Sequence, residues 1–150
     1  MPKSATTADA QVILQIYDLR REAEMRKSRE WFAGFWPQNA EEVLKIITTF
    51  PSRENTAMRQ VVSYWEMAAA IALHGAVNAE LFLEPGVSGE MMFFLAKVYP
   101  YLKEIREKMQ APEFFISCEK LIMNSKKGRE RFQRMRDRAE ARRKAPASTK

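Results

Sequence analysis

The stretch that decides the fold is SRENTAMRQVVSYWEMAAAIALHG, residues 52–75. Its apolar side chains recur at positions 58, 61/62, 65, 69 and 72/73, which is the period of an amphipathic helix. Ser52 and Asn55 are alternative N-caps, and Gly75 is suited to the position just after the helix end. Small alanines at 68–70 and 72 would let another helix approach closely. We therefore predict that this helix is the centre of the molecule.

The N-terminal side of this stretch also has helical patterns. Thr6 stands at the first position of a capping box, and the helix that it starts continues through the charged residues 20–30 and stops before Pro37. Asn39 starts a second helix, whose inward side is expected to carry Phe50 near its end.

The C-terminal side adds shorter helices. Asn78 caps a short one, and Ser88 begins an apolar one that Pro100 either kinks or replaces with a new helix. Pro112 is expected at the first position of the last core helix, which ends near Asn124. Because no stretch alternates like a β-strand, we predict an all-α fold. We expect a compact orthogonal bundle of about six helices within residues 1–125, in which the first six residues are disordered.

The basic charge of the chain is concentrated in its last 25 residues. Residues 126–150 carry 11 Lys and Arg against three acidic residues, whereas residues 1–125 carry 14 against 16. This tail has a helix-forming composition, but its apolar stripe of Phe132, Met135 and Ala139 is narrow. We expect a basic C-terminal tail that is partly helical, docks weakly, and is disordered from Ala145 onward. Its arginines are candidate phosphate contacts: Arg129, Arg131, Arg134, Arg136, Arg138, Arg142 and Arg143.

Composition excludes several classes of protein. The N-terminus has no apolar signal-peptide region, and the longest apolar run is far shorter than the roughly 20 residues needed to span a bilayer. We therefore expect a soluble, cytoplasmic protein without membrane contact. Cys118, the single cysteine, lies in an apolar helical pattern that favours a buried thiol, and His74 is best explained by its place near a helix C-terminus. One histidine is too few for a typical zinc or di-iron site, so we expect no metal and no cofactor.

No stretch matches a common catalytic or phosphate-binding motif. Asp18 and Glu22 are four residues apart and would share a face of the first helix, as a catalytic carboxylate pair could. Three neighbouring arginines would keep both carboxylates ionised, so a salt-bridged or solvated face is the better interpretation. The sequence names no catalytic residue, and it favours a protein that is not an enzyme.

Two features of the first helix are candidate protein-interaction sites. One is its charged half, represented by Arg20 and Arg21, and the other is its aromatic end, represented by Trp31, Phe32 and Trp36. Aromatic residues and arginine are enriched at protein interfaces. For the aromatic end the favoured interpretation is that these rings pack together and seal the core, and an exposed recognition patch is the alternative.

Three segments resemble a group of small bacterial helical proteins of unknown function. They are residues 9–27 (DAQVILQIYDLRREAEMRK), residues 35–37 (FWP) and residues 100–104 (PYLKE). The similarity spans roughly residues 9–130. It implies a helical fold and a bacterial cytoplasmic source, and it implies no activity and no site residues.

The leading hypothesis is a non-catalytic interaction or regulatory module that binds a protein partner or a second copy of itself. The alternative is a nucleic-acid-associated accessory protein that binds phosphates through its basic tail. An enzyme with an unrecognised carboxylate or cofactor site is the third possibility.

Overall fold

The computed structural model describes residues 3–145, and every regular element in that range is a helix. In chain order the elements are α1 (Thr7–Leu19), α2 (Ala23–Gly34), α3 (Ala40–Thr48), α4 (Arg53–Leu73), α5 (Ala79–Phe82), α6 (Pro85–Val98), the 3₁₀ turn η1 (Tyr99–Tyr101), α7 (Leu102–Met109), α8 (Ile116–Met123) and α9 (Lys126–Lys144). The all-α prediction is confirmed, while the described range holds more helices than the six expected. The disorder expected at residues 146–150 concerns a segment outside the described residues.

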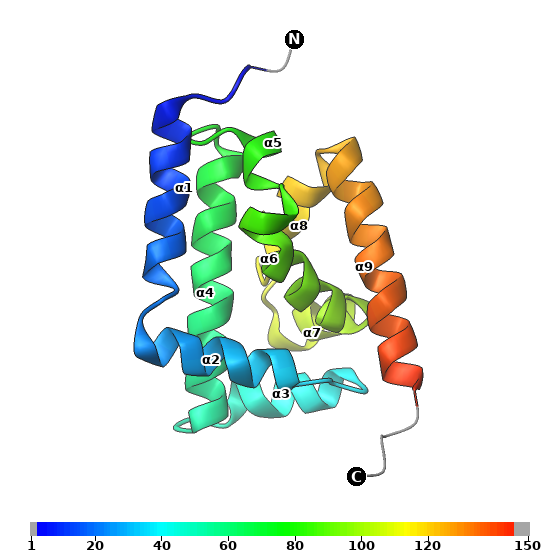
Figure 1. The fold of residues 1–150 in the computed structure, drawn as a ribbon. Coiled ribbons are helices and arrows are strands. Elements are labelled where there is room, and N and C mark those ends of the chain that lie inside the picture. The colour runs from blue at the N-terminus through cyan, green and yellow to red at the C-terminus, as the bar shows by residue number, and fades with distance from the viewer. Residues whose placement is uncertain (1–2, 146–150) are drawn as a thin grey trace.

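The helix α4 is central, as predicted. Figure 1 shows it between α1 on one side and the remaining helices on the other, with α2 crossing it. Its Trp65 is 1 % exposed, and its Ala68 and Ala69 are fully buried. Ser52 is the N-cap and accepts a hydrogen bond from the Asn55 N–H at 3.0 Å. Cys118 of α8 is fully buried among the same core side chains, as its apolar surroundings indicated.

The predicted first helix is two helices, because the chain turns at residues 20–22. Glu22 takes an extended backbone conformation and caps α2 by accepting the Met25 N–H at 2.9 Å. Arg29 of α2 forms an ion pair with Glu90 of α6, and its guanidinium also donates to the Arg20 carbonyl at 3.3 Å. Side chains of Glu22 and Arg29 therefore satisfy backbone groups on both sides of the turn. It lets α1 run beside α4 while α2 crosses α4 (Figure 1).

The turn between α3 and α4 differs from expectation at Phe50. Its side chain is 72 % exposed, not inward, because α3 ends two residues earlier, at Thr48. Asn55 instead closes this turn from within: its side-chain amide donates to the carbonyls of Ile46 and Ile47 at 3.1 and 2.9 Å. This residue is 4 % exposed, so it is part of the core.

The start of α8 was also misplaced. Pro112 lies in a turn, and the helix begins at Ile116. Glu66 of α4 supplies the missing cap, since its carboxylate accepts the backbone N–H groups of Ser117 and Cys118 at 3.1 and 3.0 Å. A cap contributed by a distant helix has no local sequence signal.

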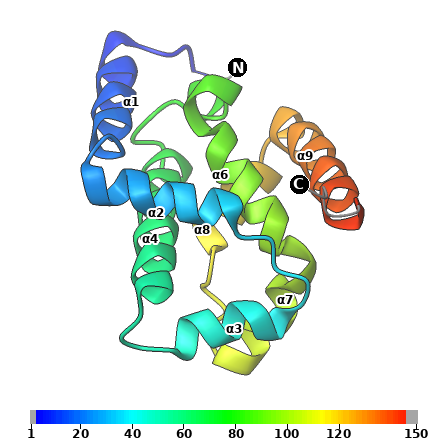
Figure 2. The ribbon, with the colours of Figure 1, turned by 60° about the horizontal axis from the view of Figure 1, so that its bottom comes forward.

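The basic helix α9 packs on the rest of the molecule, which corrects the expectation of a weakly docked tail. Phe132 is 1 % exposed and Ala139 is 3 % exposed, and both lie against the main core. The Phe132 ring meets the Tyr99 ring edge-on at 5.1 Å. At Gly128 a Cβ atom would lie 2.7 Å from the Ile122 carbonyl oxygen, so glycine is required for this close turn between α8 and α9. Figure 2 shows α9 at the edge of the molecule opposite α1.

Candidate interaction surfaces

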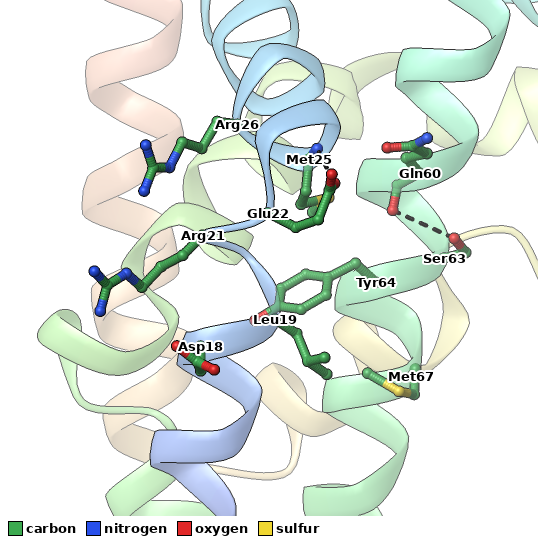
Figure 3. A pocket seen from close by; sticks show the side chains of 10 residues that line it. All are labelled: Asp18, Leu19, Arg21, Glu22, Met25, Arg26, Gln60, Ser63, Tyr64 and Met67. Atoms are coloured by element: carbon green, nitrogen blue, oxygen red, sulfur yellow. Dashed lines mark hydrogen bonds between the residues drawn. The ribbon is translucent and has the colours of Figure 1, made fainter.

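An open groove lies where the turn between α1 and α2 faces α4 (Figure 3). We call it the α1–α4 groove, and its volume is about 880 Å³. Its lining residues are Asp18, Leu19, Arg21, Glu22, Met25, Arg26, Gln60, Ser63, Tyr64 and Met67.

The inner side of the groove has satisfied polar groups. Tyr64 donates its hydroxyl hydrogen to the Ile16 carbonyl at 2.6 Å, which joins α1 to α4. Burial raises the pKa of Tyr64 to about 12, so this hydroxyl stays protonated at neutral pH. Gln60 accepts hydrogen bonds from Ser63 through its backbone carbonyl and from Ser28 through its side chain. These groups hold the helices together and leave the groove's outer edge to interact with other molecules.

The outer edge combines apolar and cationic side chains. Leu19 is 58 % exposed and Met67 is 42 % exposed. Figure 3 shows Arg21 and Arg26 extending away from the helices on one side of this edge. Within residues 3–145 neither arginine forms a salt bridge. The groove therefore presents exposed apolar surface beside two cations without an ionic partner in the described range.

The carboxylates Asp18 and Glu22 do not share a helix face, because the turn at residues 20–22 separates them. Glu22 is the N-cap of α2, and hydrogen bonds from the Glu24 and Met25 backbone N–H groups hold the pKa of its carboxyl below the usual range. A carboxyl with a lowered pKa is a poor general acid at neutral pH. Glu22 is therefore poorly suited to act as the acid of a carboxylate pair with Asp18.

Arg20, one of the sequence-predicted interaction residues, is held by its own chain. Its guanidinium carbon lies 4.5 Å from the centre of the Tyr17 ring and 5.6 Å from that of Trp65. Such cation–π contacts fix a side chain at modest energetic gain. Arg20 therefore supports the turn between α1 and α2, and Arg21 is the member of the pair that faces the groove.

The aromatic end of α2 is mostly core. Phe32 is fully buried, so its prediction as an interaction residue is wrong. Trp31 is half-buried and stacks on Phe35 at 5.1 Å, and the half-buried Trp36 packs against Phe93 at 5.7 Å. The rings at this end close the core, as the favoured interpretation of this segment predicted.

Sequence reasoning missed Lys97, which is fully buried beneath this aromatic end. Its ammonium group donates to the carbonyl oxygens of Phe32 and Ala33 at the end of α2, the latter at 3.1 Å. The Trp36 and Phe93 rings lie 4.6 and 4.9 Å from its nitrogen. Burial lowers the pKa of Lys97 to about 7. The only sequence signal was one lysine inside the apolar run MMFFLAKV (residues 91–98).

The seven arginines of α9 fall into two groups, and the first group holds the helix in place. Arg131 donates to the Leu83 carbonyl at 2.6 Å and pairs with Glu84 at 3.3 Å, and Arg143 donates to the Lys97 carbonyl at 3.0 Å. Arg136 lies over the Tyr99 ring at 4.5 Å. These three are half-buried and make contacts that α9 needs for docking.

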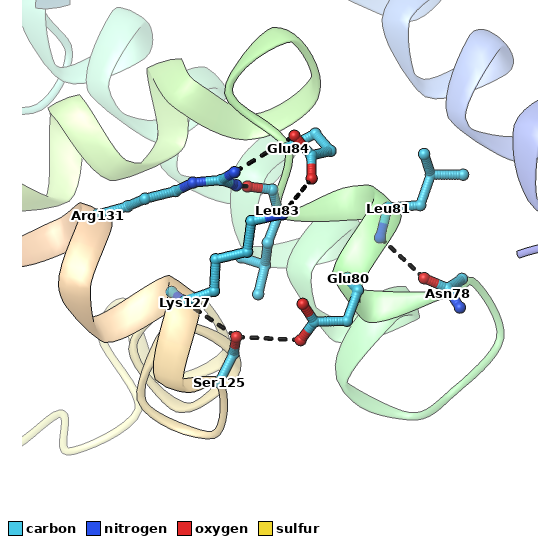
Figure 4. A network of polar contacts seen from close by, with 9 residues as sticks. Asn78, Glu80, Leu81, Leu83, Glu84, Ser125, Lys127 and Arg131 are labelled. Carbon is cyan, nitrogen blue, oxygen red and sulfur yellow. Dashed lines mark hydrogen bonds and ion pairs between the residues drawn. The ribbon is translucent and has the colours of Figure 1, made fainter. Parts of the chain in front are cut away.

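Figure 4 shows the polar contacts at the start of α9. Ser125 donates to Glu80 of α5 at 3.1 Å and caps α9 by accepting the Gly128 N–H. Lys127 pairs with Glu84 at 2.7 Å, so Glu84 binds two cations of α9. This network ties α9 to the segment that joins α5 to α6.

The second group of α9 arginines is exposed: Arg129, Arg134, Arg138 and Arg142. Arg129 donates to the carbonyl of Met123, the last residue of α8. The guanidinium carbon of Arg142 lies 5.9 Å from the Trp36 ring. Within the described residues, Arg134 and Arg138 form no salt bridge.

Residues 3–145 contain no group of three or more His, Cys, Asp and Glu residues placed to hold a metal ion. In the same range, no helix combines the length and the apolar composition needed to cross a membrane.

The architecture defines an all-helical protein with an open groove at one edge and a docked basic helix at the opposite edge. The chain belongs to the family described as Domain of unknown function (DUF4760), whose model matches residues 5–125. The expected membership of an uncharacterised helical family is thereby confirmed. No curated protein and no solved structure matches the chain. The family match covers α1 to α8 and ends immediately before α9.

Proposed function

We propose that this protein is a non-catalytic interaction module, acting through binding alone, and that its α1–α4 groove docks a protein partner. The partner segment that fits is amphipathic and acidic. Its apolar side chains would cover Leu19 and Met67, and its carboxylates would pair with Arg21 and Arg26.

The observation that carries this proposal is the edge of the groove. Exposed apolar side chains stand there beside two arginines that have no ionic partner in the described range. The carboxylate of Glu22 is already bound by backbone N–H groups of α2, so it competes weakly for these arginines. An apolar centre with charged groups around it is the usual composition of a protein interface. Arginine also binds carboxylates through two parallel hydrogen bonds.

The test compares the wild-type chain with the double variant Arg21→Glu/Arg26→Glu. The control Arg59→Glu/Lys103→Glu makes the same charge change at exposed positions outside the groove. A partner captured from cell extract is purified, and its affinity for each purified chain is measured by calorimetry. We expect at least about tenfold weaker binding for the groove variant, since each lost charge-assisted hydrogen bond is worth about 1.5–3 kcal/mol.

The control variant should bind as the wild type does. Equal affinity of all three chains would contradict docking in the groove. Light scattering of the same chains separates self-association from binding of another protein: a dimer that only the groove variant loses would identify a second copy of the chain as the occupant.

A further inference from the structure

We propose that the exposed flank of α9 binds the phosphate backbone of duplex DNA through Arg134, Arg138 and Arg142. This binding site lies at the edge of the molecule opposite the α1–α4 groove and is independent of the proposed docking there (Figure 1).

The three arginines follow one another along one flank of α9. They are spaced four residues apart, so they recur on one face at intervals of about 6 Å along the helix axis. All three are exposed. Lys127 and Arg131 project from the same flank by helical geometry, and these two are the cations that pair with Glu84. We call Arg134, Arg138 and Arg142 the arginine strip.

Three acidic residues stand on the same helix: Glu130, Asp137 and Glu140. Glu130 lies four residues before Arg134 and is therefore in line with the strip. Asp137 and Glu140 have other partners. Glu140 pairs with Lys144 at 2.6 Å, and Asp137 accepts a hydrogen bond from Gln133 at 2.9 Å. Neither partner belongs to the arginine strip. Within the described residues the strip arginines form no salt bridge, so the strip presents three unpaired cations, with the carboxylate of Glu130 in line at one end.

The strip is held in a fixed position. At one end Arg131 and Lys127 tie α9 to Glu84, and at the other end Arg143 donates to the Lys97 carbonyl. Phe132 anchors the middle of the helix in the core. A rigid site loses less conformational entropy on binding than a flexible basic tail would.

A row of arginines at regular intervals fits a polyanion of regular charge spacing. Duplex DNA presents such a backbone, and the planar guanidinium group binds phosphate oxygens through paired hydrogen bonds. A bilayer fits less well, because the apolar side of α9 is already buried and cannot insert. Single strands fit less well too, since their binding sites normally offer aromatic rings for stacking, and Trp36, beside Arg142, is packed against Phe93.

The experiment is fluorescence anisotropy of a labelled DNA duplex titrated with the full chain at several salt concentrations. The test variant is Arg134→Gln/Arg138→Gln/Arg142→Gln. The matched control is Lys45→Gln/Lys103→Gln/Lys120→Gln, which removes the same charge from exposed positions on other helices. Glutamine has nearly the helix propensity of arginine and lysine, so both variants should keep their helices.

We expect the wild type and the control to bind the duplex at about 50 mM salt, and the strip variant to bind much more weakly. Three phosphate contacts contribute about −2.7 to the slope of log K against log salt concentration, and the strip variant should lose that amount. The corresponding loss of wild-type affinity between 50 and 200 mM salt is on the order of 40-fold from these contacts alone.

Three outcomes would overturn the proposal. One is that the wild type does not bind the duplex at about 50 mM salt, where phosphate contacts are strongest. Another is that the strip variant and the charge-matched control lose the same affinity. The weaker binding would then be explained by the lower net charge of the protein and not by the position of the arginines. The third is tighter strip-dependent binding to a single strand, a polyglutamate peptide or anionic vesicles than to the duplex, which would assign the strip to that ligand.

Discussion

Lys97 is a buried cation whose hydrogen bonds are made to backbone carbonyls and not to a carboxylate. It lies at the C-terminal end of α2, where the helix dipole favours a positive charge, and aromatic faces surround its ammonium group. Removal from water is the larger effect, and it lowers the pKa of the side chain to about 7 from an ordinary value of 10.5. The folded protein therefore binds this proton less readily than the unfolded chain does.

This difference predicts a pH dependence of stability. Between pH 7 and about 10.5 the unfolded chain holds more protons at this site, so the free energy of unfolding should rise with pH, by at most about 1.4 kcal/mol per unit. Below pH 7 both states are protonated, and Lys97 should add no slope. Urea denaturation at about pH 6, 7, 8 and 9 measures the effect.

The variant Lys97→Met removes the titrating group and keeps an apolar side chain of similar length. Its stability should vary less with pH between 7 and 9 than that of the wild type. Lys103→Met, at an exposed position, should retain the wild-type profile. Parallel profiles for Lys97→Met and the wild type would show that the buried lysine does not titrate in this range.

At the scale of elements, α8 depends on a residue from another helix. Glu66 of α4 accepts the first free backbone N–H groups of α8, at Ser117 and Cys118. We expect Glu66→Ala to destabilise the fold by about 1–3 kcal/mol, because these buried donors would lose their acceptor. Glu107→Ala, at an exposed position on α7, should change the free energy of unfolding by no more than about 0.5 kcal/mol.

Denaturant titration of both variants measures this difference. Hydrogen exchange shows where in the chain the destabilisation occurs, because the amides of Ser117 and Cys118 should lose protection in Glu66→Ala. Unchanged protection at those two amides would mean that the cap contributes nothing to α8.

At the scale of the whole molecule, α9 is part of the folded unit even though the family match ends before it. Phe132 connects it to the core, where its side chain is 1 % exposed. We expect Phe132→Ala to cost about 3–5 kcal/mol, as is typical of a buried phenylalanine. Phe50→Ala is the matched control, since Phe50 is 72 % exposed and should tolerate the change.

Thermal unfolding followed by circular dichroism tests this prediction. A large drop in Tm for Phe132→Ala and a small one for Phe50→Ala would establish that α9 folds with the rest of the chain. Equal, small effects of the two substitutions would mean that α9 contributes little to stability and that it acts as a detachable tail.

Local patterns predicted the helices well wherever the chain supplied its own signals. The period of residues 58–73 placed α4 at the centre, and side chains at Thr6, Asn39, Ser52 and Asn78 cap their helices in the structure. Two errors at helix ends have a similar cause. The Arg20 carbonyl in the turn after α1 accepts a hydrogen bond from Arg29 of α2, and the first N–H groups of α8 are capped by Glu66 of α4. The periodicity of a sequence cannot predict contacts of this kind, because they depend on how separate segments pack together.

The candidate surfaces were predicted less well than the helices. Composition alone located the basic segment, and Arg21 lines the groove. Which arginines of α9 stay exposed could not be read from the sequence, because it depends on contacts with Leu83, Glu84 and Lys97. The burial of Phe32 and the groove between α1 and α4 likewise arise only when α2 crosses the central helix.

The sequence by itself therefore determined the helical class, the central helix and the segregation of positive charge into the last 25 residues. These follow from periodicity, capping residues and composition, all of which act over a few neighbouring residues. Only the tertiary structure decided where α1 turns into α2, what caps α8, and that the basic segment is a docked helix with a free arginine strip within the described range. Each of these depends on hydrogen bonds and packing between residues distant in the chain.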